Sequence, residues 1–247
     1  SGGDDVKNFG EGGEIVEIRD EREPIAEVAL AIIGRVFPPH ERHTISALRA
    51  EVEEKRLGLL EPYDYHLLAM RGEDGEVIAT VAGVYLAGLN SGFISYLATL
   101  PELRGRGVGR LIREALVECF REDAERAGRG LAVVLGEVRV ESPWLRSLVQ
   151  RGRAIPFDLT YYHPGMEPGI TEERYVLYRE AISDTRRSLP AAEVRQILYA
   201  IWRRGYRVAY PLQRPAFRAM LAELEGRSVI EIHPAFAEAV DSSTHVA

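Results

Sequence analysis

The spacing of apolar residues predicts that a strand and two helices open the folded part of the chain. Glu14–Asp20 alternates apolar and polar side chains, which is typical of a half-buried strand. The first helix is expected to begin at Pro24 and to stop before Pro38–Pro39, because proline suits the first turn of a helix and breaks a later one. A second, more polar helix follows and ends at Gly58.

Three further strands are predicted to follow as a meander. Tyr65–Arg71 is the first, and the sequence GEDGE after it is a hairpin turn signal. Val77–Gly88 is rich in β-branched residues, and LNSG then turns the chain again. Phe93–Leu100 is the last strand of the meander. The predicted order up to this point is therefore strand, two helices and three strands.

The next elements are predicted to alternate between helix and strand. Arg110–Gly128 has the clearest helical pattern in the chain, with one apolar stripe. Leu131–Val138 is a continuous apolar run, as expected of a strand that is buried on both faces. A short helix is expected within Ser142–Gly152, and two late strands within Ile155–Pro164 and Arg174–Ile182.

The C-terminal part of the chain is predicted to be a helical extension. Pro190–Gly205 is amphipathic, and Arg214–Gly226 is expected to form another helix. Ser228–Pro234 is expected to form a short strand. We therefore expect a disordered segment at 1–13, a mixed domain at 14–181, a helical extension at 182–240 and a disordered tail at 241–247.

Composition indicates a soluble globular protein that lacks a broad nucleic-acid-binding surface. The 247 residues are 46% hydrophobic and 28% charged, and the formal net charge is −7. No apolar run approaches about 20 residues, so no membrane-spanning helix is expected. The N-terminus carries no signal-peptide pattern, and the single cysteine, Cys119, cannot form an internal disulfide. These features predict a cytoplasmic protein that binds neither nucleic acid nor membranes.

The sequence LPELRGRGVGR, Leu100–Arg110, has the features of a loop that holds an anion. It lies between a predicted apolar strand and the start of the strongest helix. The first amides of a helix have no partners within it, and the helix dipole adds partial positive charge there. Three glycines let the backbone approach a ligand closely, and three arginines add charge. We therefore expect this loop to hold a pyrophosphate group.

Two commoner phosphate-binding loops fit this sequence less well. A P-loop ends in Gly-Lys followed by Ser or Thr, and the stretch contains no lysine. A dinucleotide-binding fingerprint has the form G-x-G-x-x-G and follows the first strand, whereas Gly105, Gly107 and Gly109 follow the fourth. A plain glycine-rich turn is the alternative that needs no ligand.

Arg104–Gly109 matches in full the signature Arg/Gln-x-x-Gly-x-Gly/Ala, which is the acyl-CoA loop of the GNAT acyltransferase superfamily. The strand before the motif, the helix after it and the order of elements from Glu14 to about Ala181 also resemble this family. The resemblance implies an α/β (α+β) fold with a mixed, mostly antiparallel central sheet and helices on both faces, to which the C-terminal helical appendage is added. It also implies acetyl-CoA as the co-substrate.

The resemblance implies which residues bind acyl-CoA. The loop amides would hold the pyrophosphate, and pantetheine would pair with the fourth strand, which this family separates from the fifth. Ser142 stands where some members have an asparagine that contacts the cofactor; the alternative is that Ser142 only caps its helix. The implied cofactor-binding residues are Leu97, Ala98, Thr99, Arg104, Gly105, Arg106, Gly107, Val108, Gly109, Arg110 and Ser142.

The resemblance also implies a general base. The segment GEVRVES places Glu137 where some amino-group acetyltransferases of the family have a glutamate. A carboxylate near the end of a buried strand is expected to have a raised pKa, which would suit it to accept a proton. The alternative is that Glu137 forms an ion pair with Arg139. The glutamate that other branches carry on the fourth strand is absent here.

The usual general acid of the family has no counterpart in this sequence. Many members carry a tyrosine in the helix after the fifth strand, where this chain has Leu148 and Val149. Tyr161 and Tyr162, next to His163, are expected to substitute for it; the alternative is that this aromatic strand end packs against the extension. No metal site is expected, because the histidine-bearing segment PPHERH supplies too few ligands.

Three functions remain open from the sequence. The first is an N-acetyltransferase that moves an acetyl group from acetyl-CoA to a primary amine of a small molecule or peptide, by direct attack in a ternary complex. The second is a CoA-binding regulatory module or pseudo-enzyme, which the missing tyrosine suggests. The third is an acyltransferase that uses a longer acyl chain. Trp202, Tyr206 and Tyr210 of the extension are expected to cover the acceptor side or to form a homodimer interface.

Overall fold

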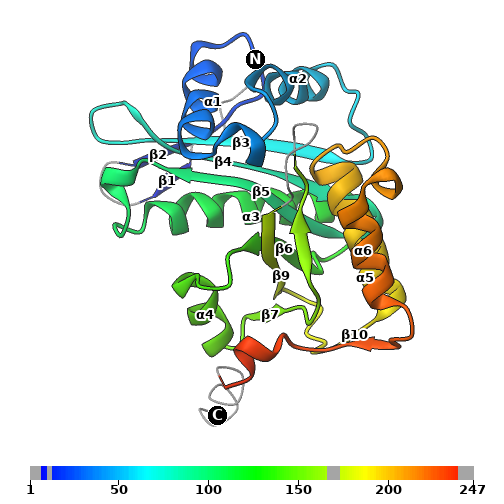
Figure 1. Cartoon of the computed structure of the whole chain (residues 1–247). Helices are drawn as coiled ribbons and strands as arrows, with labels where there is room; N and C mark the ends of the chain where they lie inside the picture. The colour runs from blue at the N-terminus through cyan, green and yellow to red at the C-terminus, as the bar shows by residue number, and fades with distance from the viewer. Residues whose placement is uncertain (1–6, 10–12, 166–172, 239–247) are drawn as a thin grey trace.

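The computed structural model describes residues 7–9, 13–165 and 173–238 (Figure 1). Its centre is a nine-stranded sheet in the order β1-β2-β3-β4-β5-β6-β9-β7, with β8 also paired to β9. Neighbouring strands are antiparallel except β5 and β6, which run parallel, so the predicted mixed sheet is confirmed. The strands are β1 Lys7–Phe9, β2 Gly13–Glu17, β3 Asp64–Arg71, β4 Val77–Leu86, β5 Ser91–Thr99, β6 Val133–Val138, β7 Ala154–Pro156, β8 Tyr161–His163 and β9 Glu173–Ala181.

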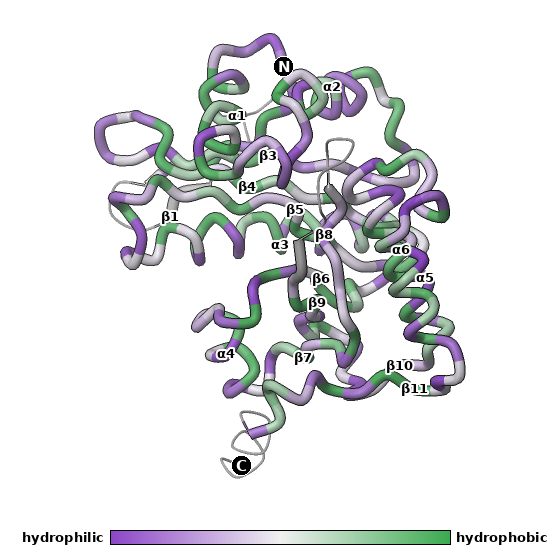
Figure 2. The backbone as a smooth tube through the Cα atoms, viewed as in Figure 1, coloured by the Kyte–Doolittle hydropathy of each residue, from purple (hydrophilic) through white to green (hydrophobic). Residues whose placement is uncertain are grey.

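Helices cover both faces of the sheet, as predicted (Figure 1). Because successive side chains of a strand point to opposite faces, Leu67 of β3 packs with α1 and α2 while Leu68 packs with α3. Figure 2 shows hydrophobic and hydrophilic residues alternating along α3, as expected of a helix with one face on a sheet. The four helices of this part are α1 Pro24–Val36, α2 Ile45–Arg56, α3 Val108–Arg126 and α4 Pro143–Gln150.

The structure corrects two details of the predicted element pattern. Lys7–Phe9 pairs with β2 and extends the sheet edge, so the expectation that 1–13 is disordered fails where the structure describes this segment. The late strand predicted within Ile155–Pro164 is divided into β7 and β8, which pair with different parts of β9. The predicted disordered tail at 241–247 lies outside the described residues.

The C-terminal extension packs against the same face of the sheet as α1 and α2. It contains α5 (Ala191–Ala200), a π-helical turn (Ile201–Gly205) and α6 (Pro215–Leu224), and the short strands β10 (Leu189–Pro190) and β11 (Val229–Ile230) pair with each other. The single helix predicted at 190–205 therefore changes to a wider π turn in its last five residues.

The π turn brings the extension against the centre of the sheet. A Cβ atom added at Gly205 would lie 2.7 Å from the ring of Phe93 on β5, so a glycine is needed for this close approach. Trp202 and Tyr206 are fully buried in the cluster that also contains α1 and α2, whereas Tyr210 is exposed. In the part of the chain that the structure describes, no helix is long and apolar enough to cross a membrane.

Candidate active site

A cleft of about 650 Å³ opens where β5 and β6 separate. Both strands lie wholly within the described residues, and they pair only at Gly92 with Val134 and at Phe93 with Leu135. Beyond that point β5 bulges, because Ile94 pairs with Gly83 but Tyr96 pairs with the preceding residue, Ala82. The cleft is lined by residues of β5, β6, the start of α3, the start of α4 and β9, and by the segment after α1.

The loop between β5 and α3 has the conformation that the glycine pattern predicts. Gly105 and Gly107 have φ angles of +84° and +78°, in the left-handed region that favours glycine. The helix α3 begins at Val108, and its N-cap Gly107 offers no side chain to the first amides. Gly109 and Arg110 line the cleft. The loop therefore presents unpaired amides and the positive end of a helix dipole beside the cleft.

The other residues predicted to bind the cofactor lie at different depths. Leu97 lines the cleft, whereas Ala98 is fully buried in the core on the opposite face. Thr99 ends β5, and its hydroxyl lies next to Gly109. Ser142 lines the cleft and also caps α4, because its Oγ accepts a hydrogen bond from the amide of Leu145 at 3.4 Å.

Glu137 lies in the wall of the cleft and is bound by two side chains from distant segments. Its Oε1 atom accepts a 2.5 Å hydrogen bond from the hydroxyl of Tyr206, in the extension, and a short one from Nδ1 of His163, on β8. The second nitrogen of His163 donates to the backbone carbonyl of Glu41 at 2.9 Å. The Oε2 atom of Glu137 has no hydrogen-bond partner among the described residues. One carboxylate oxygen is thus fixed, and the other is buried near the hydroxyl of Tyr161, which also lowers the pKa of Glu137.

The expectation that Glu137 has a raised pKa is wrong. Burial raises the pKa of its carboxyl, but the charge and hydrogen bond of His163 outweigh burial and lower it. Burial lowers the pKa of His163, and the carboxylate of Glu137 more than offsets this effect, so that pKa is raised. Each group therefore favours the charged form of the other.

Arg139 contacts the carboxylate of Glu41 and not that of Glu137, which was the alternative considered from the sequence. Arg139 lies 3.3 Å from Oε1 of Glu41, which also accepts a hydrogen bond from the hydroxyl of Tyr175 at 3.2 Å. Glu41 and Tyr175 both line the cleft. Two carboxylates, Glu41 and Glu137, therefore face this side of the cleft.

The two tyrosines proposed as general acids differ in position. Tyr161 is fully buried, and the negative charge of Glu137 adds to burial in raising its pKa. Tyr162 points elsewhere, because neighbouring residues of β8 face opposite sides; its backbone amide donates to the sulfur of Met220 on α6. Among the described residues that line the cleft, neither tyrosine occurs.

Three residues that the sequence did not indicate line the cofactor side of the cleft. The guanidinium of Arg113 on α3 lies 4.9 Å from the ring of Trp144 on α4 and 2.5 Å from Oε2 of Glu180. Tyr178 of β9 packs edge-on against the same tryptophan. Gly136 of β6 is the one feature of the sequence that could have pointed to Tyr178. A Cβ atom at this position would collide with the hydroxyl of Tyr178, and a glycine within a strand often marks such a close approach.

A separate buried cluster has the composition of a metal site but already contains a cation. His66 lies between Glu17 and Asp123, each 2.6 Å away, and Cys119 and Asp64 lie near it. The ammonium group of Lys55 is 2.9 Å from Glu17 and 3.1 Å from Asp64. This ammonium neutralises the carboxylates that a metal ion would need. Cys119 is buried, as expected of a core residue.

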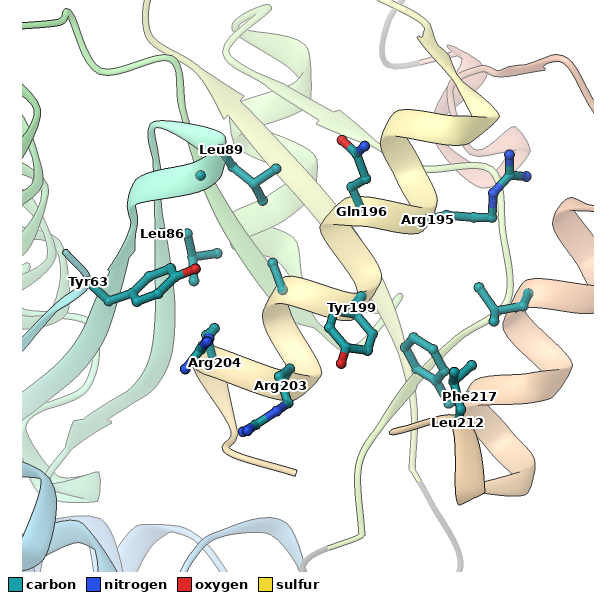
Figure 3. Close-up of a pocket in the computed structure, with 13 residues that line it drawn as sticks. Tyr63, Leu86, Leu89, Arg195, Gln196, Tyr199, Arg203, Arg204, Leu212 and Phe217 are labelled. Carbon is teal, nitrogen blue, oxygen red and sulfur yellow. The ribbon is translucent and has the colours of Figure 1, made fainter. Parts of the chain in front are cut away.

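A second cleft, of about 660 Å³, lies on the outer side of the extension (Figure 3). Its walls are mostly apolar and aromatic, including Tyr63, Leu86, Tyr199 and Phe217. Among the described residues that line it, none is a predicted site residue. The cleft between β5 and β6 is therefore the candidate active site, because it joins the glycine–arginine loop to Glu137.

Comparisons with known proteins agree with this geometry. Residues 17–136 match the model of the acetyltransferase (GNAT) family. A protein assigned to the GNAT-family acetyltransferases of Bacteroides thetaiotaomicron is 18% identical, with 74% of this chain and 92% of that chain covered and a TM-score of 0.53. A ribosomal-protein-S5-alanine acetyltransferase from Vibrio fischeri is 14% identical, with 74% and 100% covered and a TM-score of 0.51. A search of curated proteins found no significant match. The two solved structures show a common fold.

Proposed function

This chain carries an acetyltransferase domain of the GNAT family, and we propose that it moves an acetyl group from acetyl-CoA to a primary amine by direct attack in a ternary complex. The observation that carries the proposal is the continuous cleft between β5 and β6. At one end lie Gly109 and Arg110 of the amide-rich loop, and at the other lies the Glu137–His163 pair. A donor held by its pyrophosphate would thus place its thioester near a proton acceptor.

Acetyl-CoA would be bound mainly by backbone groups. The loop amides at 105–110 would receive the pyrophosphate, since an anion is favoured at the start of α3. The edge of β5 that no longer pairs with β6 leaves the backbone at Leu97–Thr99 free to pair with the pantetheine amides. Ser142, at the start of α4, lies close enough to the cleft to contact the cofactor while it caps its helix.

The acceptor amine would enter on the side where Glu41 and Glu137 lie. Carboxylates attract an ammonium ion, and Glu137, which lines the cleft, would accept a proton from it. Both ring nitrogens of His163 are already engaged, so this histidine does not touch the amine. His163 and Tyr206 are therefore positioning residues, which hold Glu137 in place.

The departing sulfur would be met by Tyr178 and not by Tyr161 or Tyr162. Tyr178 lines the cleft on the side of α4, where Leu148 replaces the family tyrosine. Burial raises the pKa of Tyr178, and the charge of Arg113 opposes this rise. A protonated phenol beside a guanidinium suits the stabilisation of a thiolate.

The resulting reaction balances as follows. The amine nitrogen attacks the thioester carbonyl carbon, the N–C bond forms and the C–S bond breaks. The ammonium first loses one proton to Glu137, and the nitrogen loses a second proton to solvent as the C–S bond breaks. The thiolate takes a proton from Tyr178, which solvent then replaces. The products are an amide and CoA.

The test is release of free thiol from acetyl-CoA in the presence of a panel of primary amines: lysine, benzylamine and an alanine-initiated peptide. We expect thiol release with at least one amine and its loss in Glu137→Gln. Glu125→Gln, which alters an exposed carboxylate of α3, is the matched control. Tight CoA binding with no thiol release for any amine would favour the regulatory-module alternative.

A further inference from the structure

Arg179 of β9 is a fully buried charge that lies outside the active site. It pairs with Leu135 of β6 and Ile155 of β7, and only 1% of its side chain is exposed. The side chain lines a cavity of about 180 Å³ between the sheet and α5. Its other polar lining residues are Ser91, Asp184, Arg186, Glu193 and Gln196, so two carboxylates and a second guanidinium also border the cavity.

The guanidinium of Arg179 is not matched by an acceptor. None of its three nitrogens has a hydrogen-bond partner in the described part of the chain. The carboxylate of Asp184 lies 3.7 Å from Nη1, beyond hydrogen-bond distance. Asp184 instead accepts hydrogen bonds from Arg186, which also pairs with Glu193 at 3.0 Å. Both nearby carboxylates are thus turned towards Arg186.

Another buried arginine shows how this fold normally neutralises such a charge. Arg113 on α3 is also buried, and its guanidinium lies 2.5 Å from Glu180, the residue that follows Arg179 on β9. Glu180 also accepts a hydrogen bond from Arg153 at 2.6 Å. Two arginines therefore share the carboxylate of Glu180 on one face of β9, whereas the carboxylate near Arg179 on the other face, that of Asp184 at 3.7 Å, is hydrogen-bonded to Arg186.

A buried guanidinium without acceptors is strongly unfavourable. Arginine stays protonated in proteins, although burial lowers the pKa of Arg179, so five N–H donors must be satisfied inside the cavity. A cavity of about 180 Å³ is several times the roughly 30 Å³ share of one water molecule, so it has room for a small polyatomic ligand. The planar fork of arginine matches the two oxygens of a carboxylate or phosphate.

We propose that this cavity is a binding site for a small oxyanion, a carboxylate or phosphate group held by the Arg179 guanidinium. Ser91 and Gln196 would supply further polar contacts. The wider cleft of Figure 3 shares Gly88, Leu89 and Gln196 with the cavity, so it gives an approach from solvent between α5 and the end of β4. The proposal concerns binding at Arg179 and does not depend on the proposed transferase reaction.

The test is calorimetric titration of the full chain, saturated with CoA so that the loop at 104–110 cannot take the probe. Acetate and inorganic phosphate are titrated separately at constant ionic strength, with chloride as the comparison salt. We expect saturable binding of acetate, of phosphate or of both, and a higher Tm in the anion that binds than in chloride. Which anion binds identifies whether the site takes a carboxylate or a phosphate group. Binding of neither anion above the chloride background overturns the proposal.

Two variants locate the site. Arg179→Met should weaken anion binding by about tenfold or more, since it removes a charged donor group. Gln196→Trp, at an exposed position of α5, should weaken binding similarly because its side chain fills the cavity. It replaces Arg179→Met as the test if that variant does not fold. Arg218→Met, at an exposed position of α6, is the matched control and should bind as the unaltered chain does. Undiminished binding in Gln196→Trp and in folded Arg179→Met would place the anion elsewhere and overturn the proposal.

Discussion

Two buried histidines of this protein are paired with carboxylates, but only one pair faces a cleft. His66 on β3 has a carboxylate at each ring nitrogen, Glu17 on one side and Asp123 on the other. The ammonium of Lys55 completes the group at 2.9 Å from Glu17. Every strong donor and acceptor of this cluster is therefore used within the protein.

The second pair, His163 with Glu137, differs because it lines the active-site cleft. His163 is held between Glu137 and a backbone carbonyl, and Tyr206 shares the same carboxylate oxygen. The other oxygen of Glu137 is buried near the hydroxyl of Tyr161. A buried cluster whose groups are all enclosed stabilises a fold, whereas one whose carboxylate and imidazole line a cleft can act on a ligand. The predictions that follow test this difference.

The largest effect is expected from Glu137→Gln. It removes the proposed proton acceptor, so kcat should fall by about 10²- to 10⁴-fold. The free energy of unfolding should fall as well, because the buried His163 loses its counter-charge, so kcat is corrected for the folded fraction. Steady-state kinetics and urea unfolding of the same sample measure the two quantities. A loss of activity no larger than that of Glu125→Gln would contradict the role of Glu137.

Asp123→Asn should lower stability without lowering kcat. It removes one of the two carboxylates that bind His66 and leaves Glu17 as the counter-charge, so about 1.5–3 kcal/mol of unfolding free energy should be lost, the scale of one hydrogen bond to a charged group. The folded fraction should keep its kcat, because the cluster around His66 lies outside the lining of the active-site cleft. Urea unfolding and kinetics corrected for folded fraction test this. A large fall in corrected kcat with little loss of stability would reverse the roles of the two pairs.

The pH dependence of the reaction should report the ionisation of the His163–Glu137 pair. The pKa of His163 is raised above its usual 6.5, so the pair keeps its proton to a higher pH than a free imidazole does and accepts another proton poorly below that pH. Activity should therefore rise with pH through a value above 6.5 and fall by about tenfold per unit below it. kcat at saturating amine measures this, and His163→Asn should lose that ionisation. An unchanged profile in His163→Asn would show that another group titrates.

Tyr206→Phe should have a smaller effect. It removes one hydrogen bond to a charged carboxylate, which is worth about 1.5–3 kcal/mol, and leaves the ring packed against Phe93. A positioning role predicts a fall in kcat together with an altered pH profile, since Glu137 loses a donor. Trp202→Phe, a matched change within the same buried π turn, should leave the pH profile as it is.

The sequence predicted the conformation of the glycine loop far better than the contacts around Glu137. The loop at 104–110 is one contiguous segment, and glycines specify its backbone geometry locally. Glu137 was found, but its pKa was predicted in the wrong direction, because the partner that decides it, His163, lies 26 residues away along the chain. Tyr206 belongs to a segment whose buried π turn no periodicity indicates. Contacts between distant segments depend on packing, which local patterns do not encode.

The smallest differences are expected within the loop itself. Gly107→Val forces a φ of +78° on a β-branched residue, which costs about 1–3 kcal/mol and displaces the amides proposed to receive the pyrophosphate. Arg106→Ala removes only an exposed side chain, so CoA affinity should fall by a few-fold at most, about the scale of one screened surface charge. Calorimetric titration with CoA, with Tm as the folding control, compares the two variants. Equal losses of CoA affinity in the two variants would mean that the charge of the Arg106 side chain, and not the backbone, holds the donor. The loop would then differ from the rest of the cleft only in its charge.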